Sequence, residues 1–167
     1  MGPAPRDLWA GAGGLLLLVL LCAAVPVGAG AAVYQLGFLR GLELPTWTPV
    51  LEVWAGVAGA AYLSMALAAW LVVRQRDLTI LGRWAIVPFE TQLALGGLAA
   101  VALFVAKVPG PALALLIVQA GALTMAAMRF YYMSRPASRL LVLSLLAVMA
   151  ALAWTGMLVV LNPEVGP

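Results

Sequence analysis

Side chains that perform covalent or metal chemistry are scarce in this 167-residue chain. It has no histidine and a single cysteine, Cys22. Without histidine there is no bis-imidazole haem site, no histidine-ligated metal and no histidine general base. One cysteine cannot form an internal disulfide or a Cys-x-x-Cys site. We therefore predict no catalytic residue, no metal ligand and no covalently bound cofactor, and we expect that the chain is not an enzyme.

Two glutamates follow prolines where apolar stretches begin. Glu52 comes after Pro49, and Glu90 comes after Pro88. The distribution of basic residues described below places them at opposite membrane faces, so they cannot form a catalytic pair. Each is interpreted as a helix N-terminal carboxylate that favours the positive end of the helix dipole, Glu90 near Arg83. For Glu52, contact with a partner or ligand is the open alternative.

Five apolar stretches account for most of the chain, whose composition is 65% hydrophobic and 9% charged. They cover about 10-34, 50-73, 86-106, 111-132 and 138-161. A hydrocarbon core of ~30 Å takes about 20 helical residues, and backbone groups in lipid must bond within their own segment. The sequence therefore predicts an all-α integral membrane protein. It is a five-transmembrane-helix bundle in a single membrane domain, 1-167, with a loop at 35-49 between the first two helices.

The first thirty residues also resemble a secretory signal. Arg6 precedes the apolar core 15-22, and small residues at 24-29 could suit a signal peptidase. Whether the first helix is retained therefore stays open.

Basic residues fall mainly on one side of the predicted bundle. That side carries Arg6, Arg74, Arg76, Arg83, Arg129, Arg135 and Arg139. The other side has Arg40 and Lys107. Because short cytoplasmic loops are enriched in Lys and Arg, we expect the N-terminus to be cytoplasmic, in a bacterial inner (cytoplasmic) membrane.

Small residues recur at helical spacing in three of the apolar stretches. The positions are Gly56 and Ala60, then Gly96, Gly97 and Ala100, then Gly121, Ala122 and Ala126. Small side chains let helix backbones approach closely in lipid. The pattern therefore predicts a tightly packed bundle with these faces between helices.

Three segments resemble the TspO/MBR family, the tryptophan-rich sensory or translocator proteins. The first segment carries Pro45, Trp47, Pro49, Tyr62, Met65, Ala68 and Ala69 in the family's order. The second is Gln92-Leu93-Ala94-Leu95, which is similar to the family's Gln-Leu-x-Leu. The third comprises Arg129-Phe130-Tyr131, Arg135-Pro136-Ala137, Leu140-Leu141-Val142 and Leu161-Asn162-Pro163.

The resemblance implies a five-helix fold with an apolar cavity covered by the loop between helices 1 and 2. It also implies ligands such as a porphyrin, sterol or carotenoid. The chain resembles a divergent member, because Gly96 stands where the family has Asn, Ala58 where it has a Trp, and Trp154-Thr155 where it has Leu-Asn. A Pro-Tyr-Leu-x-Trp segment becomes 143-147, and the family's basic cytoplasmic tail is absent from the end of the chain, which conflicts with the orientation above. The candidate ligand contacts that remain are Trp47, Tyr62 and Gln92.

Arginines flank an aromatic run near the end of the fourth stretch. Arg129 and Arg135 lie on either side of Phe130, Tyr131 and Tyr132. Such a cluster could contact lipid headgroups or a partner's acidic loop. Arg129, Arg135 and Glu52 are therefore the candidate partner or lipid contacts.

Two functional hypotheses follow. In the first, the protein is non-catalytic and binds or passes an apolar ligand (tetrapyrrole, sterol or carotenoid) by apolar burial with one or two polar anchors. In the second, the family's pocket has been lost and the chain is an accessory subunit of a larger membrane complex, photosynthetic or respiratory. Both place it in a lipid bilayer, as part of a homodimer or a larger complex, and neither involves nucleic acid.

Overall fold

The computed structural model describes residues 42–49, 51–73 and 80–163, and five positions of the first apolar stretch, namely 14, 17, 19, 20 and 24. The side chains of 51 and 80–83 are excepted. All regular structure within these residues is helical. Most of the predicted first helix, Cys22 and residues 35–41 of the loop lie outside the described residues, so the expected count of five helices is not tested.

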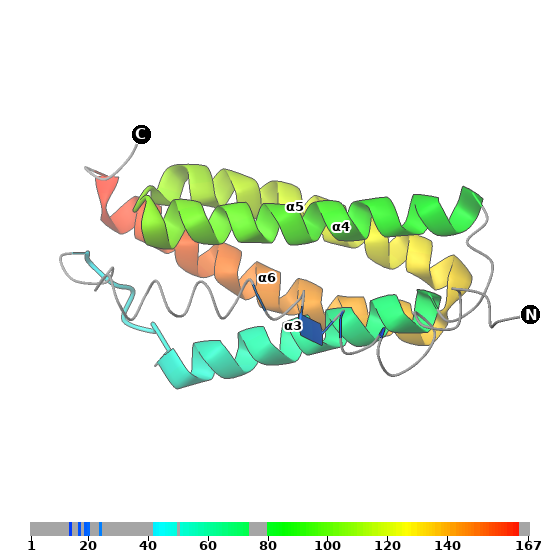
Figure 1. Cartoon of the computed structure of the whole chain (residues 1–167). Helices are drawn as coiled ribbons and strands as arrows, with labels where there is room; N and C mark the ends of the chain where they lie inside the picture. Colours follow the sequence, from blue (N-terminus) through cyan, green and yellow to red (C-terminus); the bar gives the residue numbers. More distant parts are fainter. Residues whose placement is uncertain are drawn as a thin grey trace, which may run out of the picture.

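Four helices form the described bundle (Figure 1). They are α3 (Leu51–Val73), α4 (Ile80–Ala100), α5 (Pro109–Met133) and α6 (Arg135–Leu161). A π-helical turn, η1 (Val101–Val105), extends α4. Each helix is long and apolar enough to cross a membrane, and the segment that qualifies in α4 and η1 is Trp84–Val105.

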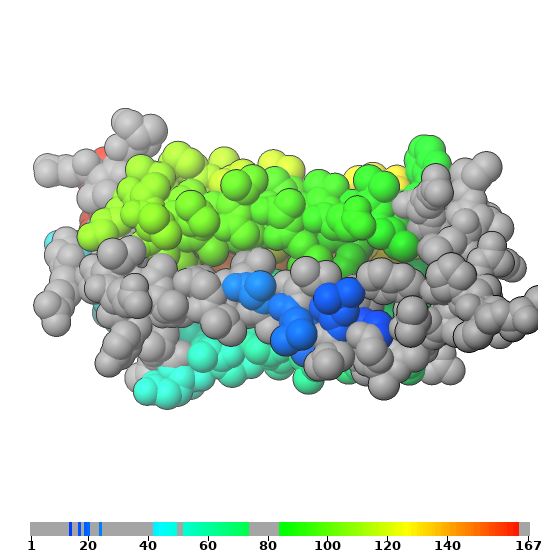
Figure 2. Space-filling model, in the orientation of Figure 1, coloured from blue at the N-terminus to red at the C-terminus, as the bar shows by residue number. Residues whose placement is uncertain are grey.

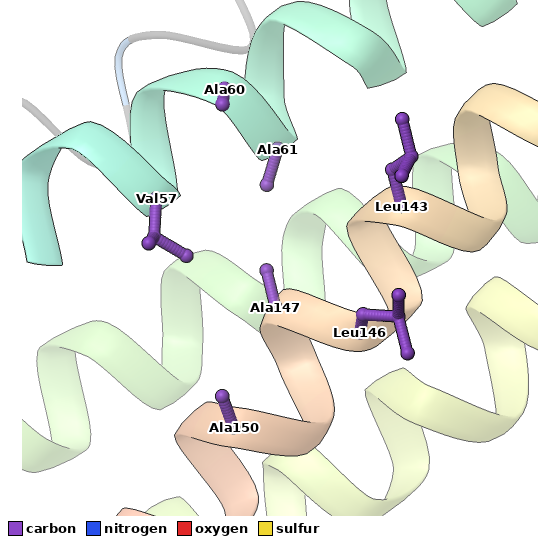
Figure 3. Close-up of a pocket in the computed structure, with 7 residues that line it drawn as sticks. All are labelled: Val57, Ala60, Ala61, Leu143, Leu146, Ala147 and Ala150. Atoms are coloured by element: carbon purple, nitrogen blue, oxygen red, sulfur yellow. The ribbon is translucent and has the colours of Figure 1, made fainter.

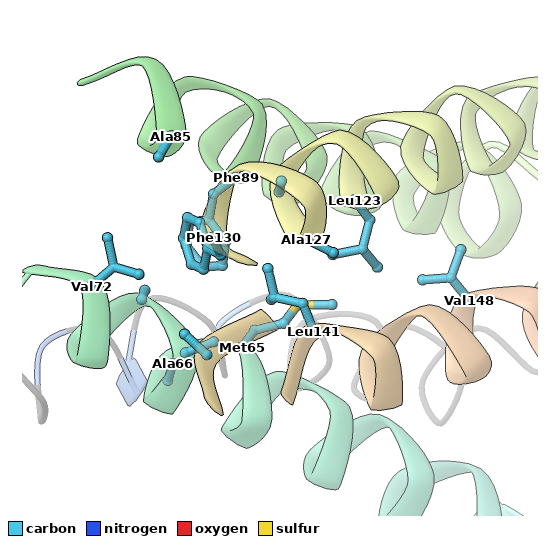
Figure 4. Close-up of a cluster of buried hydrophobic side chains, with 14 residues drawn as sticks. Met65, Ala66, Val72, Ala85, Phe89, Leu123, Ala127, Phe130, Leu141 and Val148 are labelled. Atoms are coloured by element: carbon cyan, nitrogen blue, oxygen red, sulfur yellow. The ribbon is translucent and has the colours of Figure 1, made fainter. Parts of the chain in front are cut away.

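α5 and α6 each pack against two of the other described helices. α5 lies against both α4 and α6, α6 also packs against α3, and α3 touches α4 little. The main core contains Met65, Leu123, Phe130 and Leu141, each almost wholly buried, and Phe130 stacks on Phe89 of α4 at 5.8 Å between ring centroids (Figure 4). This core therefore joins all four helices.

The first apolar stretch contributes to the same core. Val19 packs against the main cluster. Figure 2 shows the described residues of this stretch, in blue, over the space between α3 and α4.

Alanines, rather than the glycines singled out in the sequence, make most of the close contacts. Five alanines are wholly buried: Ala66, Ala68, Ala112, Ala126 and Ala137. Among the described residues, nothing lies within 4 Å of a Cβ placed on Gly56, Gly59 or Gly121. The predicted close packing is therefore not seen for Gly56 and Gly121 between the described helices. It holds for Gly96, considered below, and for Ala126.

α4 begins six residues before the predicted start at 86, so that Pro88 lies inside the helix. Proline has no N–H, and it therefore leaves the carbonyl four residues earlier, that of Trp84, without its helical donor. Arg129 of α5 donates from Nη1 to this carbonyl, and its guanidinium lies over the Trp84 ring, 5.0 Å from the centroid. A side chain from the neighbouring helix thus compensates for the proline, which is how membrane helices tolerate one.

The turn that follows η1, at the C-terminal end of α4, is centred on Lys107. Ala106 donates its N–H to the Val101 carbonyl at 2.9 Å, and Val108 donates to Ala102 at 3.0 Å. Lys107 takes the positive φ of 60° that glycine usually supplies at a helix end. This closure turns the chain directly into α5.

We predict that the contribution of Arg129 to stability depends on Pro88. Replacing Arg129→Met should lower the free energy of unfolding by about 1–2 kcal/mol, because the Trp84 carbonyl loses its donor. In a Pro88→Ala background the new backbone N–H supplies that carbonyl, so the same replacement should cost much less. Titration with SDS in mixed micelles measures both.

Arg135→Met is the matched control for this cycle. Arg135 lies over the Tyr131 ring at 5.6 Å, and within the described part of the chain it does not bond to the α4 backbone. Its effect should therefore be the same with and without Pro88. An equal cost of Arg129→Met in both backgrounds would show that Arg129 does not serve the proline-freed carbonyl.

Candidate ligand-binding site

The loop 42–49 is fastened to the C-terminal end of α6. Glu43 donates its N–H to Asn162 Oδ1 at 2.9 Å, and Asn162 Nδ2 donates to the Glu43 carbonyl at 3.0 Å. Farther along, Trp154 Nε1 donates to Thr48 Oγ1 at 3.2 Å. The two ends of this short segment are therefore both held by α6.

An aromatic pair lies beneath the loop. Trp54, in the first turns of α3, packs against Trp154 of α6 with ring centroids 5.6 Å apart. Leu42 from the loop and the buried Leu103 and Leu158 belong to the same cluster. Two buried donors here, Trp54 Nε1 and the hydroxyl of Thr155, have no hydrogen-bond partner among the described residues.

A second group of polar side chains lies deeper in the bundle. Gln92 of α4 and Gln119 of α5 are buried, and the Oε1 atoms of both amides are without a partner in the described part of the chain. Gln92 Nε2 lies 3.5 Å from Met65 Sδ, a weak acceptor. Both amides are therefore only partly satisfied.

Gly96 makes the room for this group. A Cβ on Gly96 would lie 2.7 Å from Gln119 Nε2 and 3.3 Å from the Tyr62 hydroxyl oxygen. The amide of Gln119, from α5, thus occupies the space beside α4 where the related family pattern has an asparagine side chain. The glycine and the glutamine are complementary in volume.

These polar groups are near the middle of the membrane span. Tyr62 is about 16 Å from the start of α3, Gln119 about 15 Å from the start of α5, and Gln92 about 20 Å from the end of η1, at 1.5 Å per residue. The hydrocarbon layer is ~30 Å thick. These side chains therefore lie too deep to form hydrogen bonds directly with water at either membrane surface.

A neighbouring polar contact between α3 and α6 is fully bonded. The hydroxyl oxygens of Ser64 and Ser144 lie 2.7 Å apart. Both are also within hydrogen-bonding distance of the Ala61 carbonyl oxygen, Ser64 at 2.7 Å and Ser144 at 3.0 Å. This contact ties α3 to α6 and leaves no unsatisfied atom. It contrasts with the two glutamines at a similar depth.

A groove opens on the outer side of this contact. It has a volume of about 370 Å³ and is lined almost entirely by apolar atoms. The side chains that line it face one another across α3 and α6 in Figure 3: Val57, Ala60, Ala61, Leu143, Leu146, Ala147 and Ala150. The groove suits a hydrocarbon chain and offers no polar anchor of its own.

The sequence-derived contacts are divided between two places. Tyr62 and Gln92 belong to the mid-bundle group, the first half-buried and the second completely buried. Trp47 is 48% exposed on the turn that follows Pro45, at the loop end of the bundle. Trp47 therefore lies on the loop and does not belong to the group that contains Tyr62 and Gln92.

The other predicted contacts lie at the two ends. Glu52 is exposed in the first turn of α3, as expected for a helix N-terminal carboxylate. Arg129 and Arg135 lie at the opposite end, over Trp84 and Tyr131. None of the three belongs to the interior group.

Sequence reasoning missed Gln119, Trp54, Trp154 and Thr155 as interior residues. Gln119 had a readable signal, since it is the one amide side chain in the 25-residue α5. Trp154 and Thr155 were noted only as departures from the family pattern. No group of three His, Cys, Asp or Glu side chains that could hold a metal occurs among the described residues.

The volume match at Gly96 generates a prediction. Gly59→Ala should stabilise the protein by up to about 1 kcal/mol through helix propensity, because its Cβ meets nothing within 4 Å. Gly96→Ala should give no such gain, because its Cβ displaces the buried Gln119 amide. Thermal unfolding in detergent compares them, and equal gains would show that the amide has free space to move.

Comparison with known proteins identifies the family. The TspO/MBR family model matches residues 15–165, which includes the loop, both polar groups and all four described helices. A search of curated proteins finds no match. The resemblance drawn from the sequence is thus confirmed, and the chain belongs to the TspO/MBR family of integral membrane proteins.

Proposed function

We propose that this protein binds a largely apolar ligand inside the bundle, between the loop 42–49 and the level of Gln92 and Gln119, and holds or passes it without chemical change. The observation that carries the proposal is the set of buried polar atoms without partners. Leaving such an atom unsatisfied costs about 1–3 kcal/mol. A ligand that bonds to these atoms recovers that free energy.

The polarity of these atoms supports one ligand class over the others. Trp54 and Thr155 offer donors beneath the loop, and Gln92 and Gln119 offer carbonyl oxygens near the middle of the span. A free-base tetrapyrrole carries carboxylates at one edge and, when the ring is bent out of its plane, N–H donors at its centre that reach an acceptor beside the ring, so it matches both levels. A sterol has one hydroxyl, and a hydrocarbon carotenoid has no polar group. The tetrapyrrole is therefore our first choice.

The aromatic pair supports a flat ligand as well. Trp54 and Trp154 supply ring faces at the loop end, and offset or tilted stacking on such faces is favourable. The bond from Trp154 to Thr48 would couple ligand entry to movement of the loop. Trp47 would contact the ligand at the rim, so Trp47→Ala should weaken binding, whereas Trp84→Ala at the opposite end should not.

We predict opposite effects of Gln119→Leu on stability and on binding. Without ligand, the variant should be as stable as the native protein or more stable, because an unsatisfied buried amide has been removed. Affinity for protoporphyrin IX should fall about tenfold, equivalent to about 1.4 kcal/mol. Quenching of tryptophan fluorescence in micelles measures the affinity.

Two controls make this test specific. Thr124→Val alters a hydroxyl on α5 that bonds to the Ala120 carbonyl of its own helix at 2.8 Å, and it should leave affinity unchanged. Zinc protoporphyrin IX replaces the central N–H donors by a metal that accepts an axial oxygen ligand, so Gln119→Leu should change the ratio of the affinities for the two porphyrins. Affinity for the free base that is unaffected by Gln119→Leu would contradict the proposal.

A role as an accessory subunit of a larger membrane complex is the second candidate. The glycines Gly56, Gly59 and Gly121 favour it, since nothing within the described bundle requires them. The mass of the particle extracted in mild detergent, recorded with its absorption spectrum, separates the two. A small particle with stoichiometric pigment supports ligand binding. A large particle with other subunits and no pigment in this chain supports the accessory role.

A further inference from the structure

Arg139 is an exposed cation in the second turn of α6. Within the described part of the chain, its guanidinium makes no ion pair, hydrogen bond or ring contact. Arg135, one turn earlier and also exposed, lies over the Tyr131 ring. Like charges four residues apart on a helix repel each other, and neither α5 nor α6 contains an aspartate or glutamate. The start of α6 therefore carries positive charge that these two helices do not neutralise.

The position of Arg139 along α6 places it near the boundary between hydrocarbon and headgroups. The 27 residues of α6 span about 40 Å, against ~30 Å for the hydrocarbon layer. A centred helix thus extends about 5 Å beyond that layer at each end, and Arg139 lies about 6 Å from the start of α6. A long arginine side chain at this depth keeps its guanidinium among the headgroups. Lipid phosphates, which arginine binds through two parallel hydrogen bonds, lie at the same level.

The apolar groove between α3 and α6 begins one turn below Arg139. Leu143 is the first groove residue on α6, and Ala150 is the last. At 3.6 residues per turn, Arg139, Leu143, Leu146 and Ala150 fall within an arc of about 60° around the helix axis. Arg139 and Ala150 are about 17 Å apart along the helix, close to half of the ~30 Å hydrocarbon layer. The groove therefore runs inward from the cation over the depth of one lipid leaflet.

We propose that this outer face binds one anionic phospholipid, with its phosphate at Arg139 and one acyl chain in the groove. The groove is lined almost entirely by apolar atoms and has a volume of about 370 Å³. Figure 3 shows its side chains on both helices, with Ala61 of α3 facing Ala147 of α6. The bonded pair Ser64 and Ser144 joins α3 to α6 beside it. The lipid would thus lie outside the bundle, separate from the interior group of Gln92 and Gln119.

Other occupants satisfy only part of this surface. A neutral apolar molecule fills the groove and leaves Arg139 without a counterion, and a zwitterionic lipid brings its own cation with the phosphate. A transmembrane helix is 10–12 Å wide, so a segment as long as the groove occupies more than about 1000 Å³ and does not fit inside it. A second copy in the same orientation would bring its own Arg139 to the same level, where a twofold axis places like charges together.

Native mass spectrometry of the full chain in detergent tests the proposal. The probes are palmitoyl-oleoyl phosphatidylglycerol and palmitoyl-oleoyl phosphatidylcholine, and the quantity measured is the Kd of the first bound lipid. We expect phosphatidylglycerol to bind about tenfold more tightly, because one charge-assisted contact is gained. Arg139→Gln should weaken phosphatidylglycerol alone and remove most of this difference. Lys107→Gln, which removes one cation at the opposite end of the bundle, is the matched control and should keep it.

Filling the groove provides a second measurement. Ala147→Leu should weaken binding of both lipids severalfold, because the added side chain takes the place of the acyl chain. Ala150→Leu makes the same change at an exposed position deeper in the groove. Ala114→Leu, on the exposed surface of α5, is the control and should weaken neither lipid. Retained chromatographic size and thermal stability show that each variant is folded.

Three results would overturn the proposal. The first is equal affinity of the native protein for the two lipids, or a preference for phosphatidylglycerol that survives Arg139→Gln. The second is lipid affinity unchanged in both Ala147→Leu and Ala150→Leu. The third is a dimer that these two substitutions dissociate, since a second copy would then occupy the groove. No porphyrin is present in either measurement, so the outcome is independent of the interior ligand.

Discussion

Inside a bilayer a polar group can be satisfied only by the protein or by what the protein binds, and this constraint organises the described bundle. The Trp84 carbonyl shows it most simply. Pro88 removes the helical donor of that carbonyl, and Arg129 of the next helix replaces it. Because the replacement comes from α5, the proline becomes a tie between two helices instead of a break in one.

The same constraint distinguishes two polar contacts in the interior. Ser64, Ser144 and the Ala61 carbonyl satisfy one another and join α3 to α6. Gln92 and Gln119 lie at a similar depth and each keep an unpartnered oxygen. A bundle that needed only to be stable would be served as well by leucine at both positions. Under the proposed function, the amides serve ligand binding, at some cost to the stability of the unliganded bundle.

Hydropathy and length were sufficient to predict the described helices, because twenty apolar residues in lipid have few alternatives to a helix. The start of α4 could not be predicted, since the residue that compensates for Pro88 is forty-one positions away in sequence. The surroundings of the small residues could not be predicted either. Their spacing places Gly56 and Ala60 on one face of a helix but does not say whether that face contacts another helix or lipid. Tyr62 and Gln92 were found through the family pattern. Gln119 stood out in the sequence as the one amide of its helix, but its place beside Gly96 required the structure.

The unpartnered interior atoms also have a distribution that spacing alone could not reveal. Trp54, Gln92, Gln119 and Thr155 come from α3, α4, α5 and α6 respectively, one from each described helix. A ligand bonded to all four would link every described helix, including α3, which touches α4 little. Since any molecule that binds only the folded state stabilises it, occupancy of the site and the cohesion of α3 with the other helices would be coupled. Trp154 of α6 donates a hydrogen bond to Thr48 of the loop 42–49. Ligand occupancy would therefore affect the position of this loop first.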